Sequence, residues 1–101
     1  MDQQTLEVML EELDRVDRRA YGMALESLDT PLPRPDLVYE AAGLAERLVS
    51  IAEELRVNAP QTRQRRASQI SEATMDLDHV QGKTRFMSRR VGRRYLDRRR
   101  P

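Results

Sequence analysis

Residues 59–101 read APQTRQRRASQISEATMDLDHVQGKTRFMSRRVGRRYLDRRRP, and this stretch decides the expected fold. Its first half carries small and apolar residues at helical spacing: Ile70, Ala73, Leu77 and Val80. The second half, after Gly82, is densely basic and keeps only a narrow apolar stripe. We therefore predict a helix over residues 60–81. Residues 83–98 either continue this helix through Gly82 or form a short fourth one.

Two amphipathic helices are predicted upstream, over residues 3–29 and 35–57. Asp2 can cap the first, because a short carboxylate accepts hydrogen bonds from the first free amides of a helix. Pro35 suits the first position of the second. Both carry apolar residues at alternating spacings of three and four, typical of bundle helices. These residues are Leu6, Met9, Leu13, Val16, Ala20 and Met23 in the first, and Leu37, Ala41, Leu44, Leu48, Ile51 and Leu55 in the second.

The segment PLPRP, residues 31–35, separates these two helices. Proline fixes its own backbone and disfavours helix in the residue before it, so the segment is expected to be a stiff, extended connector. Its PxxP-like spacing also occurs in ligands of SH3 domains, but a plain loop is the simpler interpretation.

Together the segments predict an all-α protein, a three-helix up-down-up bundle whose third helix extends into a basic C-terminal helix. Residues 1–81 would form the bundle core and residues 82–101 a basic amphipathic helix and tail. A chain of 101 residues buries only a modest core, and its long apolar seams favour a homodimer or larger oligomer. The expected core and oligomer residues are Leu13, Val16, Leu44, Leu48, Ile51, Ile70 and Leu77.

Composition narrows the class of protein further. The chain has no cysteine, which rules out disulfides, zinc–thiolate sites and thiol nucleophiles and fits a reducing compartment. Met1–Gln4 does not begin a secretory signal, and no apolar run reaches membrane-spanning length. We therefore expect a cytoplasmic protein that does not bind membranes.

Charge is divided unevenly along the chain. Residues 1–58 hold 13 acidic and 6 basic side chains, a net charge of −7. Residues 59–101 hold 12 basic and 4 acidic side chains, a net charge of +8. Such a division favours either an anionic partner for the C-terminal part or pairing between the two halves.

The basic C-terminal helix is the main functional signal, because arginines on a helix can neutralise successive phosphates of a nucleic acid. No base-reading motif is present, so binding would not depend on sequence. The predicted phosphate contacts are Lys83, Arg85, Arg89, Arg90, Arg93, Arg94 and Arg98, with a second basic cluster at Arg63, Arg65 and Arg66. Three alternatives stay open: a solvated helix end, pairing with acids such as Glu7, Glu11, Glu12 or Asp14 of a neighbouring subunit, and an anionic membrane surface, which the narrow apolar face disfavours.

Catalysis is not expected. His79 is the only histidine, and with Asp76 it supplies just two potential metal ligands. No glycine-rich phosphate loop and no Ser/His/Asp set is present, so no cofactor or metal is predicted. The sequence thus favours a small non-enzymatic protein that contacts nucleic acid. The alternative is a helical adaptor, inhibitor or chaperone that binds another protein, or an acidic protein surface, through its charged faces.

Overall fold

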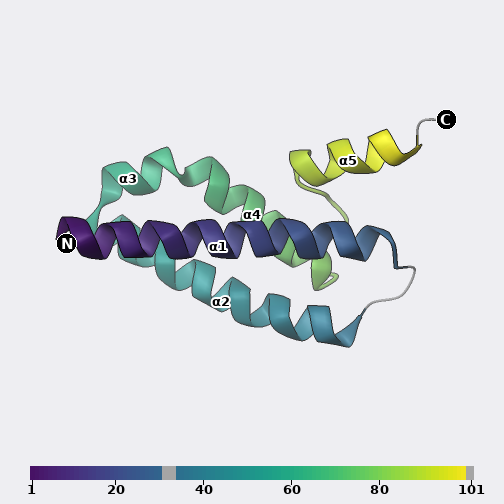
Figure 1. Ribbon diagram of the computed structural model, residues 1–101, viewed down its shortest axis with the longest axis horizontal. Coiled ribbons are helices and arrows are strands. Elements are labelled where there is room, and N and C mark those ends of the chain that lie inside the picture. Colours follow the sequence, from purple (N-terminus) through teal and green to yellow (C-terminus); the bar gives the residue numbers. More distant parts are fainter. Residues whose placement is uncertain (31–33, 100–101) are drawn as a thin grey trace.

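The computed structural model describes residues 1–30 and 34–99, and this part of the chain is helical and contains no strand (Figure 1). The predicted all-α class is therefore confirmed. α2 runs back along α1, and the chain then returns through α3 and α4 before α5 (Figure 1). The five helices of the described residues are α1 (Gln3–Leu28), α2 (Pro35–Asn58), α3 (Pro60–Arg65), α4 (Ala67–Val80) and α5 (Arg89–Arg99).

The first two helices begin and end within one residue of their predicted bounds. The Asp2 carboxylate accepts a hydrogen bond from the amide of Thr5 at 2.7 Å, which confirms the predicted cap of α1. Pro35 is the first residue of α2. Residues 31–33 of the predicted connector lie outside the described residues. The predicted extended form of the connector and its SH3-ligand interpretation therefore stay predictions.

The single helix predicted over residues 60–81 is wrong, because the chain bends at Arg66 and forms two helices. Arg66 has φ −96° and ψ 6°, which interrupts the helical hydrogen bonds between α3 and α4. Only α4 carries the buried seam, whereas α3 buries none of its residues. α4 therefore packs into the core, whereas α3 contacts α2 with residues that are not fully buried. The Arg66 side chain donates to Asp14 of α1 at 3.2 Å and to Gln69 at 3.0 Å, which ties the bend to α1.

Gly82 ends α4, so the basic segment forms a separate helix rather than a continuation. The amide of Gly82 donates to the carbonyl of His79, and the amide of Lys83 donates to the carbonyl of Asp78. This pair of bonds is the Schellman motif, which needs a residue with positive φ at the glycine position. Gly82 has φ +74° and is the only residue with positive φ in the described chain.

Gly82→Ala should destabilise the protein by about 1–2 kcal/mol, because an L-residue is strained in the left-handed region. No atom lies within 4 Å of the added methyl group, so the cost comes from the backbone alone. Gly22→Ala is the matched control: Gly22 lies within α1, its Cβ position is also open, and alanine should stabilise the helix by up to about 1 kcal/mol. Urea unfolding followed by circular dichroism measures both, and shifts of the same sign would contradict the assignment of Gly82 as the helix end.

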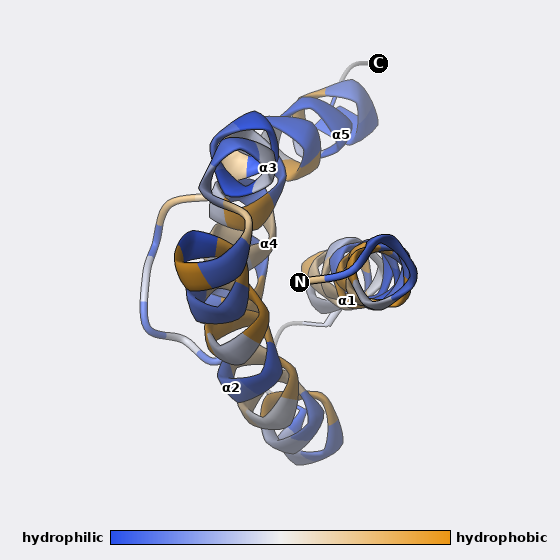
Figure 2. Cartoon of the chain, turned by 90° about the vertical axis from the view of Figure 1, so that its left-hand side faces the viewer, coloured by the Kyte–Doolittle hydropathy of each residue, from blue (hydrophilic) through white to orange (hydrophobic). Residues whose placement is uncertain are grey.

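The core lies between α1, α2 and α4, where the apolar seams of the three helices meet. Figure 2 shows hydrophobic stripes on α2 and α4, whereas α5 is almost wholly hydrophilic. Of the expected core residues, Leu44 is partly buried and the other six are buried: Leu13, Val16, Leu48, Ile51, Ile70 and Leu77. Val91 of α5 joins this core. No helix of the described chain is both long enough and apolar enough to cross a bilayer.

Candidate nucleic-acid interface

α5 is held against the bundle by its own first turn. The Ser88 hydroxyl accepts a hydrogen bond from the amide of Val91 at 3.3 Å, which caps the helix, and the carbonyl of Ser88 accepts from Gly92 at 2.8 Å. Ser88 and Val91 are both buried. The start of α5 is thus fixed on α1 and α4, and the basic helix is not a free tail.

Arg90 anchors the same turn through a buried ion-pair network. Its guanidinium lies 2.6 Å from Asp17 Oδ1 of α1 and 2.7 Å from Asp76 Oδ2 of α4. It also lies 4.9 Å from the centre of the Tyr21 ring, a cation–π distance. The predicted phosphate contact Arg90 is therefore turned toward the bundle, and only 29% of its side chain is exposed.

Asp76 is the most buried charged residue of this network, with no exposed surface. Burial raises the pKa of its carboxyl group, and Ser88 and Arg90 both oppose that rise. Oδ2 is paired with Arg90, but Oδ1 has no hydrogen-bond partner in the described chain. The fold therefore depends on Arg90 to compensate a buried carboxylate.

The surface of the segment that carries α5 is strongly basic. We define the basic surface as six side chains of residues 83–99 that form no ion pair with an acidic residue of the described chain: Lys83, Arg85, Arg89, Arg93, Arg94 and Arg99. Arg89 and Arg93 are one turn apart, and each lies about 200° around the helix axis from buried Val91. Both are exposed, and Arg89 also lines an open hollow with Ser71 and Met75 of α4.

Five of the nine arginines before residue 83 form an ion pair within the described part of the protein, and four form none there: Arg15, Arg18, Arg63 and Arg65. Arg19 forms two hydrogen bonds to Glu40, at 2.5 and 2.8 Å, and Arg47 pairs with Glu12, so two bridges join α1 to α2. These hydrogen bonds lower the pKa of both glutamates. From the C-terminal half, Arg98 pairs with Asp29 at 2.5 Å. Pairing between the two halves thus accounts for Arg66, Arg90 and Arg98, whereas the basic surface, like Arg63 and Arg65, has no acidic partner among the described residues.

The two predicted basic clusters are not brought together. α3 contains Arg63 and Arg65, and Arg66 follows it directly. α3 and α5 lie at opposite ends of α4 and do not contact each other (Figure 1). Arg66 is moreover paired with Asp14. Of the predicted nucleic-acid residues, five belong to the basic surface, and Arg90 and Arg98 are held in ion pairs instead.

Sequence reasoning missed the network of Asp17, Asp76 and Arg90. One signal could have revealed part of it. Asp76 directly precedes Leu77 and lies three residues after Ala73, so it borders the buried seam of α4. A carboxylate at such a position requires a buried cation or hydrogen-bond donors. The identity of that cation depends on tertiary packing. His79 and Asp76 belong to no group of potential metal ligands in the described part of the chain.

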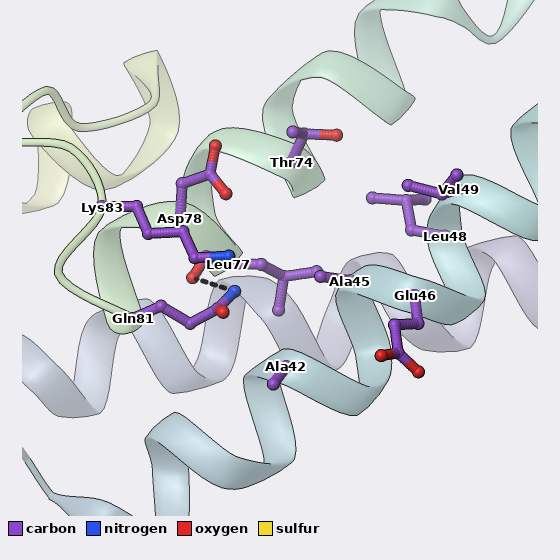
Figure 3. Close-up of a pocket in the computed structure, with 10 residues that line it drawn as sticks. All are labelled: Ala42, Ala45, Glu46, Leu48, Val49, Thr74, Leu77, Asp78, Gln81 and Lys83. Atoms are coloured by element: carbon purple, nitrogen blue, oxygen red, sulfur yellow. Dashed lines mark hydrogen bonds between the residues drawn. The ribbon is translucent and has the colours of Figure 1, made fainter.

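An open groove of about 470 Å³ lies between α2 and α4. Figure 3 shows Ala45, Leu48 and Val49 of α2 facing Leu77 and Gln81 at the end of α4. The Gln81 amide donates to the carbonyl of Leu77 at 3.3 Å, so its polar end is satisfied locally (Figure 3). The groove has an apolar floor, and its chemistry suits a protein side chain better than a reaction. Comparisons with protein families, curated proteins and solved structures find no match to this chain.

Proposed function

We propose that this chain is a small non-enzymatic helical protein that contacts nucleic-acid phosphates through its basic surface, without reading base sequence. One observation carries the proposal: six cations of residues 83–99 lack acidic partners in the described chain, whereas most other arginines are paired. Unpaired like charges repel one another, and contact with the phosphates of a polyanion relieves that repulsion. The protein cations at the same time release the counterions that were condensed on the polyanion.

The anchoring of α5 supports the same proposal. A helix fixed by Ser88, Arg90 and Val91 presents its outer arginines in a constant arrangement. Arg89 and Arg93 stand about 6 Å apart along the helix axis. Phosphate contacts of this kind position a protein on nucleic acid but carry no base information. The proposal also includes a homo-oligomer built from an up-down-up bundle and a cytoplasmic location, which the absence of cysteine favours.

The test compares two double variants that remove the same charge. Arg89→Gln with Arg93→Gln should weaken binding to two unrelated DNA duplexes by the same factor. It should also reduce the slope of log affinity against log salt by about 1.8, because each lost phosphate contact contributes about 0.9. Arg47→Gln with Arg56→Gln is the control, since both arginines lie on α2 and are paired, Arg47 with Glu12 of α1 and Arg56 with Glu53. Fluorescence anisotropy across a salt series measures the affinity of each double variant for each of the two duplexes.

Two results would contradict the proposal. The first is that the full-length protein binds no nucleic acid at low salt. The second is that the control weakens binding as much as the α5 variant, which would mean that net charge alone matters.

A second candidate function is an adaptor, inhibitor or chaperone that binds another protein. It is favoured by three large apolar side chains that α2 exposes to solvent, Tyr39, Val49 and Val57, one of which lines the groove in Figure 3. Val49→Lys would then abolish capture of a discrete protein and leave DNA binding unchanged. If nucleic-acid binding is the function, Val49→Lys leaves that function unchanged.

A further inference from the structure

The loop between α4 and α5, residues 81–88, exposes the only phenylalanine of the chain. Phe86 is 76% exposed, although burying an aromatic ring is among the largest apolar gains available to a side chain. The loop around it is held at both ends, by the hydrogen bonds of Gly82 and Lys83 and by buried Ser88. The amide of Phe86 itself donates to the Thr84 hydroxyl at 3.1 Å. The ring is therefore presented by an ordered loop.

The residues close to this ring in the sequence include three cations. Lys83 and Arg85 precede it and Arg89 follows it, all three exposed and all three part of the basic surface. A ring next to several cations is the combination that binds single-stranded nucleic acid: the ring stacks on an unpaired base, and the cations follow the backbone. In a duplex the bases are already stacked on each other, so a side chain reaches their faces only by paying to unstack them.

We propose that this loop is a binding site for single-stranded nucleic acid, in which Phe86 stacks on an unpaired base while Lys83, Arg85 and Arg89 contact the flanking phosphates. The inference rests on the proposed function and narrows it to one class of ligand. Stacking accepts any base, so the site has no strong sequence preference. A protein pocket is the less favoured occupant, because it would have to neutralise three cations around the ring it accepts.

The test uses a labelled single-stranded thymidine oligonucleotide and a duplex of the same length, with binding followed by anisotropy at fixed salt. Phe86→Ala and Phe86→Leu should each weaken binding to the single strand about 5- to 100-fold, the effect of losing one stacked base, and leave the duplex within about twofold. Phe86→Tyr should retain the affinity for the single strand. Leucine is the matched control, since it keeps an apolar side chain without a ring face.

A direct reading of stacking comes from Phe86→Trp, which gives the chain its only tryptophan. Its fluorescence should be quenched by the single strand and not by the duplex. Because Phe86 is exposed, none of these variants should change the helical circular dichroism signal.

The outcomes separate this inference from the proposed function. Loss of binding in the Arg89 and Arg93 double variant with no change in Phe86→Ala would overturn the stacking site and leave the phosphate surface standing. Full retention by Phe86→Leu would overturn stacking in favour of an apolar contact. Absence of binding to both oligonucleotides at low salt would defeat the proposed function itself, and the loop would then be a protein-binding site.

Discussion

Leu48→Asp should unfold the protein at neutral pH. Leu48 is 2% exposed in a single chain and lies in the core between α2 and the other long helices. A carboxylate placed there has no buried cation to pair with, and an unpaired buried charge costs several kcal/mol. That cost is comparable with the whole stability of a small domain, about 5–15 kcal/mol. Circular dichroism should show loss of the helical signal, and thermal scans should lack a cooperative transition.

Val49→Asp is the matched control, because Val49 is the next residue of α2 and is 68% exposed. It should keep the helical signal and a cooperative transition. Light scattering adds a second reading: if α2 forms an interface between copies, Val49→Asp lowers the mass while the chain stays folded. A Leu48→Asp variant that is folded and of unchanged mass would contradict the assignment of Leu48 to the core.

The parts of the fold that the sequence predicts are those set by local rules. The seams at spacings of three and four place α1 and α2, and Asp2 and Pro35 mark where these helices begin. Each signal acts within a few residues, so no knowledge of packing is needed to read it. Gly82 is the limit of such local rules, because the sequence allows either a continued helix or a separate one there.

The parts that sequence reasoning missed depend on contacts between distant residues. The bend at Arg66 contains neither glycine nor proline, and its side chain pairs with Asp14, 52 residues away. Arg90 lies in an arginine-rich run, and the local sequence does not distinguish it from its neighbour Arg89. Only the docking of α5 on α1 and α4 turns Arg90 inward and Arg89 outward. Local patterns do not contain that docking geometry.

The anchoring of α5 also bears on the proposed division at residue 81. A chain that ends at Gln81 would lose buried Val91 and would leave Asp76 without its arginine. Residues 1–81 would therefore lack both Ser88 and Arg90, the groups that stabilise the Asp76 carboxylate. We expect such a fragment to be less stable than the full chain. A lower affinity for nucleic acid could then come either from the missing arginines or from unfolding of the fragment. Point substitutions in the full chain avoid this difficulty.

Arg90→Met should destabilise the protein by about 3–5 kcal/mol, because it leaves Asp76 buried and unpaired. Methionine keeps an unbranched apolar stem and removes the guanidinium, so the loss comes mainly from the charge, its hydrogen bonds and its contact with Tyr21. Arg89→Met, one residue earlier, removes an unpaired exposed charge and should leave stability nearly unchanged. Urea unfolding of both variants measures the difference. Equal stability of the two would show that the Asp17–Arg90–Asp76 network contributes nothing to the fold.

Two further measurements identify Asp76 as the cause of that loss. Asp76→Asn with Arg90→Met should recover much of the stability, since the fully buried charge is then gone and the remaining Asp17 is 14% exposed and still accepts a hydrogen bond from Gln69. The pH dependence has a definite sign. The pKa of Asp76 in the folded chain lies above the ordinary 3.8, so its contribution to stability is full below 3.8 and is lost as pH rises through the raised value. Arg90→Met raises that pKa further, because it removes a cation that favours the charged form. The stability difference between wild type and Arg90→Met should therefore be largest at neutral pH and shrink as pH falls toward 3.8. A difference that is constant with pH would assign the loss to packing of α5 and not to the buried carboxylate.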